Sequence, residues 1–188
     1  MLVEVVKAVR GAIPDTTPLC LRISATEWME WSGQDSWDLE QSVKLAHLLP
    51  ELGVDLLDVS SGGNNSEQKI QIHPYYQVNL AGEIRAGLKK AGKELLIGAV
   101  GMITNAEMAR DIVQEGCLCT KGEDPEKGQG RVEVDEEQGE TAQADVVIIA
   151  RQFLREPEFV LRIAQHLGIP VKWANQYGRA GWPRNQAV

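Results

Sequence analysis

Four continuous apolar runs, each followed by a stretch with helical spacing, limit the folds open to this chain more than any other feature. The runs cover residues 18–25, 54–63, 94–104 and 144–152, and the helical stretches follow at 38–53, 76–92, 105–116 and 157–168. Continuous apolar runs are typical of parallel strands that are covered on both faces. Strand–helix repetition with short connections therefore predicts an α/β fold with a parallel sheet.

Four strand–helix units fit two architectures, a small doubly wound sheet or half of an eight-fold β/α barrel. A whole barrel typically takes about 250 residues, and this chain has 188. We therefore expect a single partial domain over residues 1–188. Residues 120–143 are rich in glycine and acidic side chains, which predicts a surface insertion, and residues 171–188 are expected to form a C-terminal tail.

Charge and cysteine content narrow the kinds of partner to expect. The formal net charge is −8, which disfavours a nucleic-acid binder because such proteins need basic patches. No run reaches 18 apolar residues and residues 1–15 lack the layout of a signal peptide, so we expect no membrane partner. The cysteines follow no zinc-ligand spacing, which favours reduced thiols, a cytoplasmic location and no metal site.

Two arginines lie near the carboxyl ends of the predicted strands, where parallel α/β folds bind their ligands. Arg22 lies inside the first apolar run, and Arg151 lies in the fourth, directly after its apolar core. Each has two interpretations. It is either an exposed arginine at a strand end or a guanidinium that reaches a bound anion or, for Arg22, an electron-rich ring. A guanidinium that faces a helix N-terminus suits a phosphate.

Gly101 interrupts the third apolar run near its end, in "IGAVGMIT". A glycine there either makes a tight turn or lets backbone N–H groups close on a phosphate. Thr104 and Glu107 have the spacing of a capping box, which predicts that the next helix begins at Thr104. Together with Arg151 one unit later, Gly101 predicts a phosphate site.

The sequence contains no convincing nucleophile or proton-transfer set. His47 and His166 lie in helical stretches, and His166 is near a helix end, where a cation complements the helix dipole. His73 is the one histidine in a predicted loop near the ligand-binding edge, and Tyr75 and Tyr76 behind it are expected to pack against the sheet. We therefore assign no catalytic residue.

Six motifs, in their order along the chain, resemble the FMN-dependent Old Yellow Enzyme family, above all its branch of NADH:flavin oxidoreductases and NADPH dehydrogenases. They are "PLCLRISATEW", "GVDLLDVSSGGN", "HPYYQV", "IGAVGMIT", "ARQFLREPEFVLRIA" and "NQYGRAGW". The resemblance covers nearly the whole chain except residues 120–143. It implies the carboxyl-terminal half of a TIM (β/α)8 barrel, with the four strands here matching the fifth to the eighth.

The resemblance also implies roles for five residues. Arg22 matches an arginine that faces the flavin ring and stabilises the negative charge of reduced FMN. Gly101 matches a glycine whose backbone contacts the FMN phosphate, and Ala150 and Arg151 match a Gly-Arg pair that completes this phosphate site. Alanine in place of glycine at position 150 narrows the permitted backbone angles. Arg179 matches an arginine that reaches across a dimer interface toward the active site of the neighbouring subunit.

The implied activity is reduction of activated alkenes, which are small-molecule substrates, by FMN that NADPH or NADH has reduced. The family residues that anchor the substrate and donate the proton lie in the amino-terminal half. The resemblance thus implies a fragment that is inactive alone, with a homodimer through the C-terminal tail. The alternative is a non-catalytic half barrel that pairs with itself or with another protein. Another phosphate-binding barrel, such as a dihydroorotate dehydrogenase-like or aldolase-like enzyme, is disfavoured because its site would need neither "HPYYQV" nor "QYGRAGW".

Overall fold

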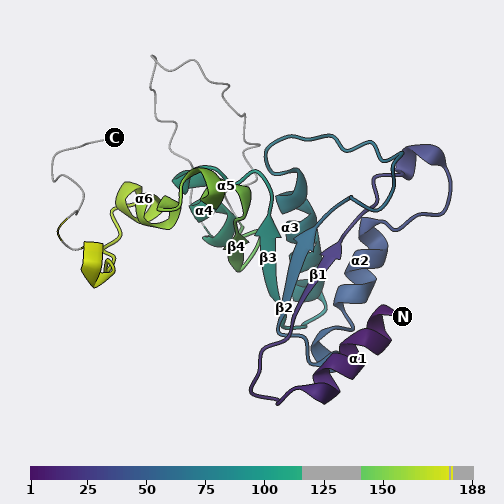
Figure 1. The fold of residues 1–188 in the computed structure, drawn as a ribbon. Coiled ribbons are helices and arrows are strands. Elements are labelled where there is room, and N and C mark those ends of the chain that lie inside the picture. The colour runs from purple at the N-terminus through teal and green to yellow at the C-terminus, as the bar shows by residue number, and fades with distance from the viewer. Residues whose placement is uncertain (116–140, 178, 180–188) are drawn as a thin grey trace.

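The computed structural model describes residues 1–115, 141–177 and 179, and within them four parallel strands form one sheet (Figure 1). The strand order follows the chain, β1-β2-β3-β4, and every neighbouring pair is parallel. A doubly wound sheet would reverse its direction of growth, whereas a barrel wall adds each strand beside the last. The α/β fold is confirmed, and its strand order is that of half a barrel wall. The strands are β1 (Cys20–Ser24), β2 (Leu56–Ser60), β3 (Leu96–Val100) and β4 (Val146–Ile148).

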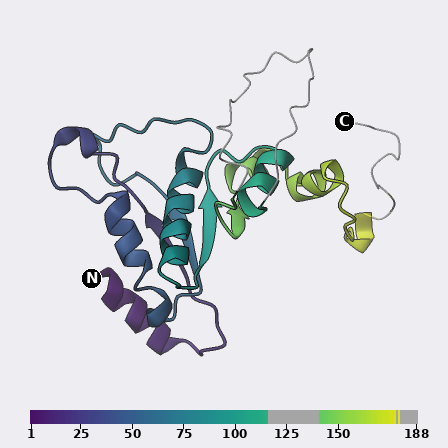
Figure 2. The same cartoon turned by 180° about the vertical axis from the view of Figure 1, so that it is seen from behind.

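Helices follow the strands as the spacing of apolar residues predicts. Helix α3 packs on β2 and β3, α2 packs on α3, α4 packs on β4, and α6 packs on α4 (Figures 1 and 2). None of the described helices has the length and apolar character needed to cross a membrane. The α-helices are α1 (Leu2–Ala12), α2 (Leu39–Ala46), α3 (Tyr76–Lys90), α4 (Ala106–Val113), α5 (Arg151–Arg155) and α6 (Phe159–His166), and the 3-10 helices are η1 (Glu30–Ser32), η2 (Pro50–Leu52) and η4 (Asn175–Tyr177).

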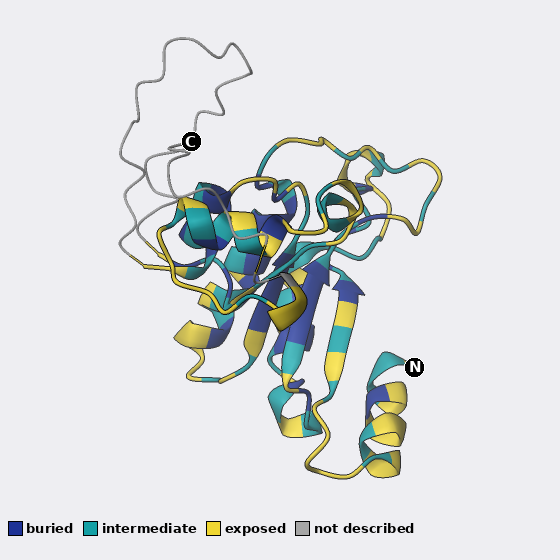
Figure 3. Ribbon diagram, turned by 60° about the vertical axis from the view of Figure 1, so that its left-hand side comes forward, coloured by how far each residue is buried: buried dark blue, intermediate teal, exposed yellow. Residues whose placement is uncertain are grey.

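The two faces of the sheet differ in burial. Leu57 and Val59 of β2, with Ile97 and Ala99 of β3, are fully buried in the hydrophobic core together with the helices. Side chains alternate between faces along a strand, so the residues between these four point to the opposite face. There Asp58 and Gly98 are also buried, but the residues on either side of them along this face of β2 and β3 are intermediate or exposed. Figure 3 shows such less buried segments along the strands. Among the described residues, helices cover one face only, which is how the wall of a barrel differs from a doubly wound sheet.

Each strand begins two residues after the start of its apolar run and ends before the run does. In the fourth run β4 ends at Ile148, and helix α5 begins inside the run at Arg151. The expectation that this run continues as a strand through residue 152 is therefore wrong. Helix α6 packs through Phe159 and Ala164, which are buried, whereas Val160 is 55% exposed.

The predicted insertion and tail lie largely outside the described residues. Of residues 120–143 only 141–143 are described, and of residues 171–188 only 171–177 and 179. Cys117 and Cys119 are also outside them. Cys20, the remaining cysteine, is a free thiol at the exposed start of β1.

Candidate functional site

A cavity of about 330 Å³ lies at the carboxyl ends of β3 and β4. Gly101, Ala150 and Arg151, the three residues predicted to form a phosphate site, all line it. Gly101 directly follows β3, and Arg151 is the first residue of α5, three residues after the end of β4. Because neighbouring parallel strands end at the same edge of a sheet, the fold brings these separate motifs together.

The cavity carries positive charge although the chain has a net charge of −8. Its lining residues include two arginines, Arg151 and Arg155, and no carboxylate. Arg155 donates a long hydrogen bond of 3.4 Å from Nη1 to Gln152 Oε1. Arg151 is exposed, and its guanidinium makes no hydrogen bond or ion pair with any residue that the structure describes. Both guanidinium groups are thus available to an anion.

Gly101 makes a turn that other residues would make only with strain. Its φ angle is +116°, and a φ in this range is readily adopted only by glycine. A Cβ atom at this position would lie 2.5 Å from Nε2 of Gln77, well inside van der Waals contact. Both the turn and the close approach therefore require glycine, and no side chain at position 101 narrows the cavity.

Gln77, on α3, joins the ends of two strands behind this turn. Its Oε1 accepts hydrogen bonds from Ser61 N at 3.1 Å and from Ser61 Oγ at 2.9 Å. Its Nε2 donates to the carbonyl oxygen of Val100 at 2.8 Å. Sequence reasoning missed this residue. The signal available in the sequence was a glutamine at helical spacing from the apolar residues Ala81, Ile84 and Leu88. In the structure Gln77 is 6% exposed.

Ala150 stands where the family pattern has glycine, and its backbone shows why alanine fits. The residue precedes α5 with φ −120° and ψ −80°, so it does not need the positive φ that only glycine adopts easily. Its side chain is exposed and meets the cavity edge. The substitution therefore leaves the backbone at this corner free to approach a ligand.

The start of α4 differs from the predicted capping box. Asn105, not Thr104, is the N-cap: its Oδ1 accepts a hydrogen bond from Met108 N at 2.8 Å. Glu107 does not fold back on the helix start but contacts Nε2 of His166 on α6. The capping-box prediction is wrong because Asn105, one residue later and in an extended conformation, has the side-chain length and position to close the first turn.

Arg22 is not part of the cavity and lies instead on β1, paired with Asp58 of β2. Its Nε and Nη2 atoms are each 2.5 Å from Asp58 Oδ2. The Arg22 side chain is 56% exposed, whereas that of Asp58 is 11% exposed. Asp58 Oδ1 is buried without a hydrogen-bond partner in the described part of the chain. Arg22 thus pairs with Asp58 but keeps about half of its side chain exposed, on the face of the sheet that the helices leave open.

The remaining predicted residues lie around the cavity or apart from it. His73 is exposed, its Nδ1 donates to the carbonyl oxygen of Pro74 at 2.7 Å, and its ring lies 6.2 Å from that of Tyr76. Tyr75 is buried in the core, as expected of a residue that packs against the sheet, whereas Tyr76 lines the cavity. Arg179 is exposed. The described residues contain no group of three or more metal-ligating side chains.

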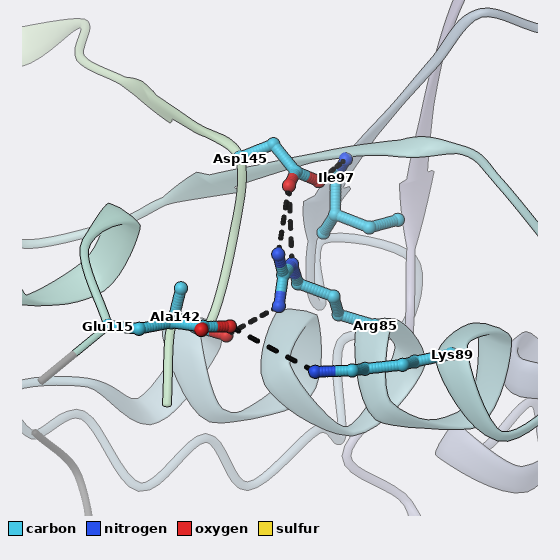
Figure 4. Close-up of polar contacts among 6 residues, drawn as sticks. All are labelled: Arg85, Lys89, Ile97, Glu115, Ala142 and Asp145. Atoms are coloured by element: carbon cyan, nitrogen blue, oxygen red, sulfur yellow. Dashed lines mark hydrogen bonds and ion pairs between the residues drawn. The ribbon is translucent and has the colours of Figure 1, made fainter. Parts of the chain in front are cut away.

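A larger hollow of about 570 Å³ lies at the opposite, amino-terminal edge of the sheet. Arg85 and Lys89 of its lining each pair with a carboxylate (Figure 4). Arg85 binds Asp145 Oδ1 through Nε at 3.3 Å and Nη2 at 3.2 Å, and Ala142 O through Nη1 at 3.1 Å. Asp145 Oδ2 in turn accepts from Ile97 N at 2.8 Å. Residues at this end of a β/α wall serve stability, so we assign this cluster to holding β4 on β3 and α3.

Comparison with known proteins places these features in a family. An NADH:flavin oxidoreductase of Gibberella zeae is 36% identical over 94% of this chain and 37% of its own length. An NADPH dehydrogenase of Listeria innocua is 32% identical over 96% of this chain and 42% of its own length. An NADPH dehydrogenase of Bacillus subtilis is 31% identical over 88% of this chain and 38% of its own length.

The chain spans less than half the length of these curated relatives, which agrees with a half barrel. No family model matches the chain. The names of the relatives are those of Old Yellow Enzymes, the family that the six motifs resemble. The chain therefore belongs to the Old Yellow Enzyme family of NADH:flavin oxidoreductases and NADPH dehydrogenases.

Proposed function

We propose that this chain supplies the FMN phosphate site of an NAD(P)H-dependent flavin oxidoreductase. The observation that carries the proposal is the cavity that joins Gly101, Ala150 and Arg151, with Arg155 as a second cation and no carboxylate in the lining. The relatives are named NADH:flavin oxidoreductase and NADPH dehydrogenase, and these names support a flavin and a nicotinamide cofactor.

The residues of the cavity fit the phosphate end of FMN. A phosphate needs donors that approach closely, and Gly101 presents backbone with no Cβ in the way. Arg151 offers a planar fork of N–H donors that matches phosphate oxygens, and Arg155 adds charge from one helical turn further on. When bound, FMN supplies the hydride chemistry between a nicotinamide and an activated alkene.

Arg22 is the proposed partner of the flavin ring. A cation beside the ring favours the negative charge that reduction places there, and the charge of Asp58 moderates that effect. We assign no proton donor or nucleophile among the described residues. Three points stay predictions: the small-molecule substrate, the cytoplasmic location, and a homodimer through the C-terminal tail with Arg179 at its interface.

Titration of FMN into the purified chain, followed by flavin fluorescence, tests the phosphate site. Arg151→Gln removes one charged donor and is expected to weaken FMN binding about tenfold or more, since a hydrogen bond to a charged group contributes about 1.5–3 kcal/mol. Arg162→Gln is the matched control, because Arg162 is an exposed arginine of α6 that pairs with Glu156. Equal FMN affinity in both variants would argue against the proposed site.

Turnover is a separate readout of the same proposal. Because the chain spans 37–42% of its relatives, we expect it to oxidise NADPH negligibly by itself, even with FMN added. Rapid, FMN-dependent reduction of an activated alkene by this chain alone would contradict the proposal that it supplies only part of the active site.

The alternative function, a non-catalytic half barrel that pairs with a second copy, is favoured by one observation. Leu96 and Val146 remain 51% and 36% exposed on β3 and β4. Exposed apolar side chains on a sheet face are typical of association surfaces. Under this alternative the chain would form a stable dimer that shows no flavin binding at all.

A further inference from the structure

We propose that Gln77 is the positioning residue of the phosphate site: it holds the backbone at Gly101 in place by tying α3 to the ends of β2 and β3. The proposal rests on the proposed function, because it concerns the phosphate end of the same FMN site. Gln77 does not line the cavity, so it acts through Gly101 rather than by touching the ligand.

The hydrogen bonds of Gln77 restrain both strand ends at once. Ser61 follows β2 and gives two hydrogen bonds to Oε1, while Val100 ends β3 and receives one from Nε2. The side-chain amide of a glutamine has two acceptor positions and two donors, and three of these four are used here. Gln77 is 6% exposed, so little water is present to replace its side chain. Loss of the side chain would therefore leave the backbone groups that it binds without a hydrogen-bond partner.

The contact with Gly101 gives the same residue a steric role. A Cβ at Gly101 would fall 2.5 Å from Nε2 and 3.3 Å from Cδ of Gln77. The turn therefore lies directly against the amide that holds Val100, the residue before it. Next to this turn, Met102 also has a positive φ of 52°. Two successive residues in uncommon conformations persist only where the surroundings fix them, and Gln77 is the neighbour that does so.

A purely structural glutamine and a positioning glutamine differ in what they do to ligand binding. Loss of a structural residue lowers the stability of the chain and weakens the binding of every ligand alike. Loss of a residue that positions the phosphate-binding backbone weakens only the binding of ligands that carry the phosphate. Riboflavin, which has the ring and ribityl chain of FMN without the phosphate, separates the two cases.

The experiment compares dissociation constants of FMN and riboflavin for the unmodified chain, Gln77→Met and Gln41→Met. Methionine keeps the length of glutamine and removes its hydrogen bonds. Gln41 is an exposed residue of α2 whose side-chain amide donates to Ser36 O. We expect Gln77→Met to raise the FMN constant about tenfold, the effect of about one misplaced charged hydrogen bond. The riboflavin constant and both constants of Gln41→Met should stay unchanged.

Two results would overturn the positioning role: equal weakening of FMN and riboflavin in Gln77→Met, or no change in either. If the unmodified chain shows no preference for FMN over riboflavin, the proposed function itself fails and this inference fails with it. Circular dichroism checks that Gln77→Met is folded. If it is not, Ser61→Ala removes only the hydroxyl hydrogen bond to Oε1, and a smaller, FMN-specific loss is then expected. Absence of that loss also contradicts the proposal.

Discussion

Gly101 and Gln77 constrain one another at the residue scale. The glycine tolerates a φ of +116°, and the absent Cβ leaves room for an amide that three hydrogen bonds hold in place. A flexible side-chain end would normally move away from a new methyl group, but this one cannot move without breaking its hydrogen bonds. The cost of a substitution at Gly101 should therefore depend on which residue occupies position 77.

A double-mutant cycle on unfolding free energy measures this dependence. Gly101→Ala is expected to destabilise the chain by about 2–3 kcal/mol, from backbone strain and the clash with Gln77 together. In a Gln77→Ala background the same change should cost about 1 kcal/mol less, because the clash is gone and only the strain remains. Urea unfolding of the four proteins gives the result. Additive effects would mean that Gln77 does not crowd the turn.

The Arg22–Asp58 pair should respond unequally to loss of its two members. Asp58 is nearly buried and Arg22 is about half exposed. Removal of the arginine therefore leaves an unpaired carboxylate that has little contact with water. We expect Arg22→Met to lower the unfolding free energy by about 3 kcal/mol and Asp58→Asn by about 1 kcal/mol. Urea unfolding tests this order: the midpoint of Arg22→Met should be lower than that of Asp58→Asn. A larger loss in Asp58→Asn would contradict the burial argument.

At the scale of elements, the cap of α4 separates the predicted helix start from the observed one. Asn105 caps the helix through Met108 N, and Thr104 is exposed beside it. Asn105→Ala is expected to cost about 1 kcal/mol of unfolding free energy, the usual contribution of an N-cap. Thr104→Ala, the control, should cost less than about 0.5 kcal/mol. A larger loss of thermal stability in Thr104→Ala than in Asn105→Ala would contradict this assignment and support a cap at Thr104.

The strand–helix units could be predicted because burial imposes a pattern on the sequence. Apolar runs mark β1 to β4, and helical spacing marks α3 and α6, because these elements pack on one shared core. The short helix α5 was missed because five residues give too little periodicity to detect. The open face was missed as well, since an apolar run does not tell whether a second protein segment or a helix will cover it.

The candidate site was predictable only in part. Gly101 and Arg151 are visible in the sequence, because a glycine in an apolar run and a charge directly after one are local exceptions. Arg155 is not, since its approach to the cavity depends on where α5 begins. The pairing of Arg22 with Asp58 depends on strand register, which a sequence does not state. Contacts between distant segments are what the fold adds.

At the scale of the whole molecule, the uncovered face of the sheet sets what the chain can do alone. Across the middle of this face the register aligns Arg22, Asp58, Gly98 and Val146. A row that combines an ion pair with apolar residues is suited to the interior of a closed barrel. Among the strands that the structure describes, β1 and β4 each have one edge without a partner, and such edges invite association.

Light scattering after size exclusion tests whether this face drives association. We expect the mass to rise above the 20.7 kDa of one chain as concentration increases. Leu96→Ser with Val146→Ser should return it toward the monomer, because both side chains are exposed on the open face. Val5→Ser with Val9→Ser is the control, since these exposed valines lie on α1. A concentration-independent monomer would contradict the expectation.

The most direct test of the central claim, that the cavity between β3 and β4 holds the phosphate of FMN, is the ratio of riboflavin to FMN dissociation constants for the unmodified chain. Flavin fluorescence titrations at one ionic strength provide both constants. A cavity with two arginines and the Gly101 turn predicts that FMN binds at least about tenfold more tightly than riboflavin. Equal affinities, or binding of neither flavin, would contradict the claim.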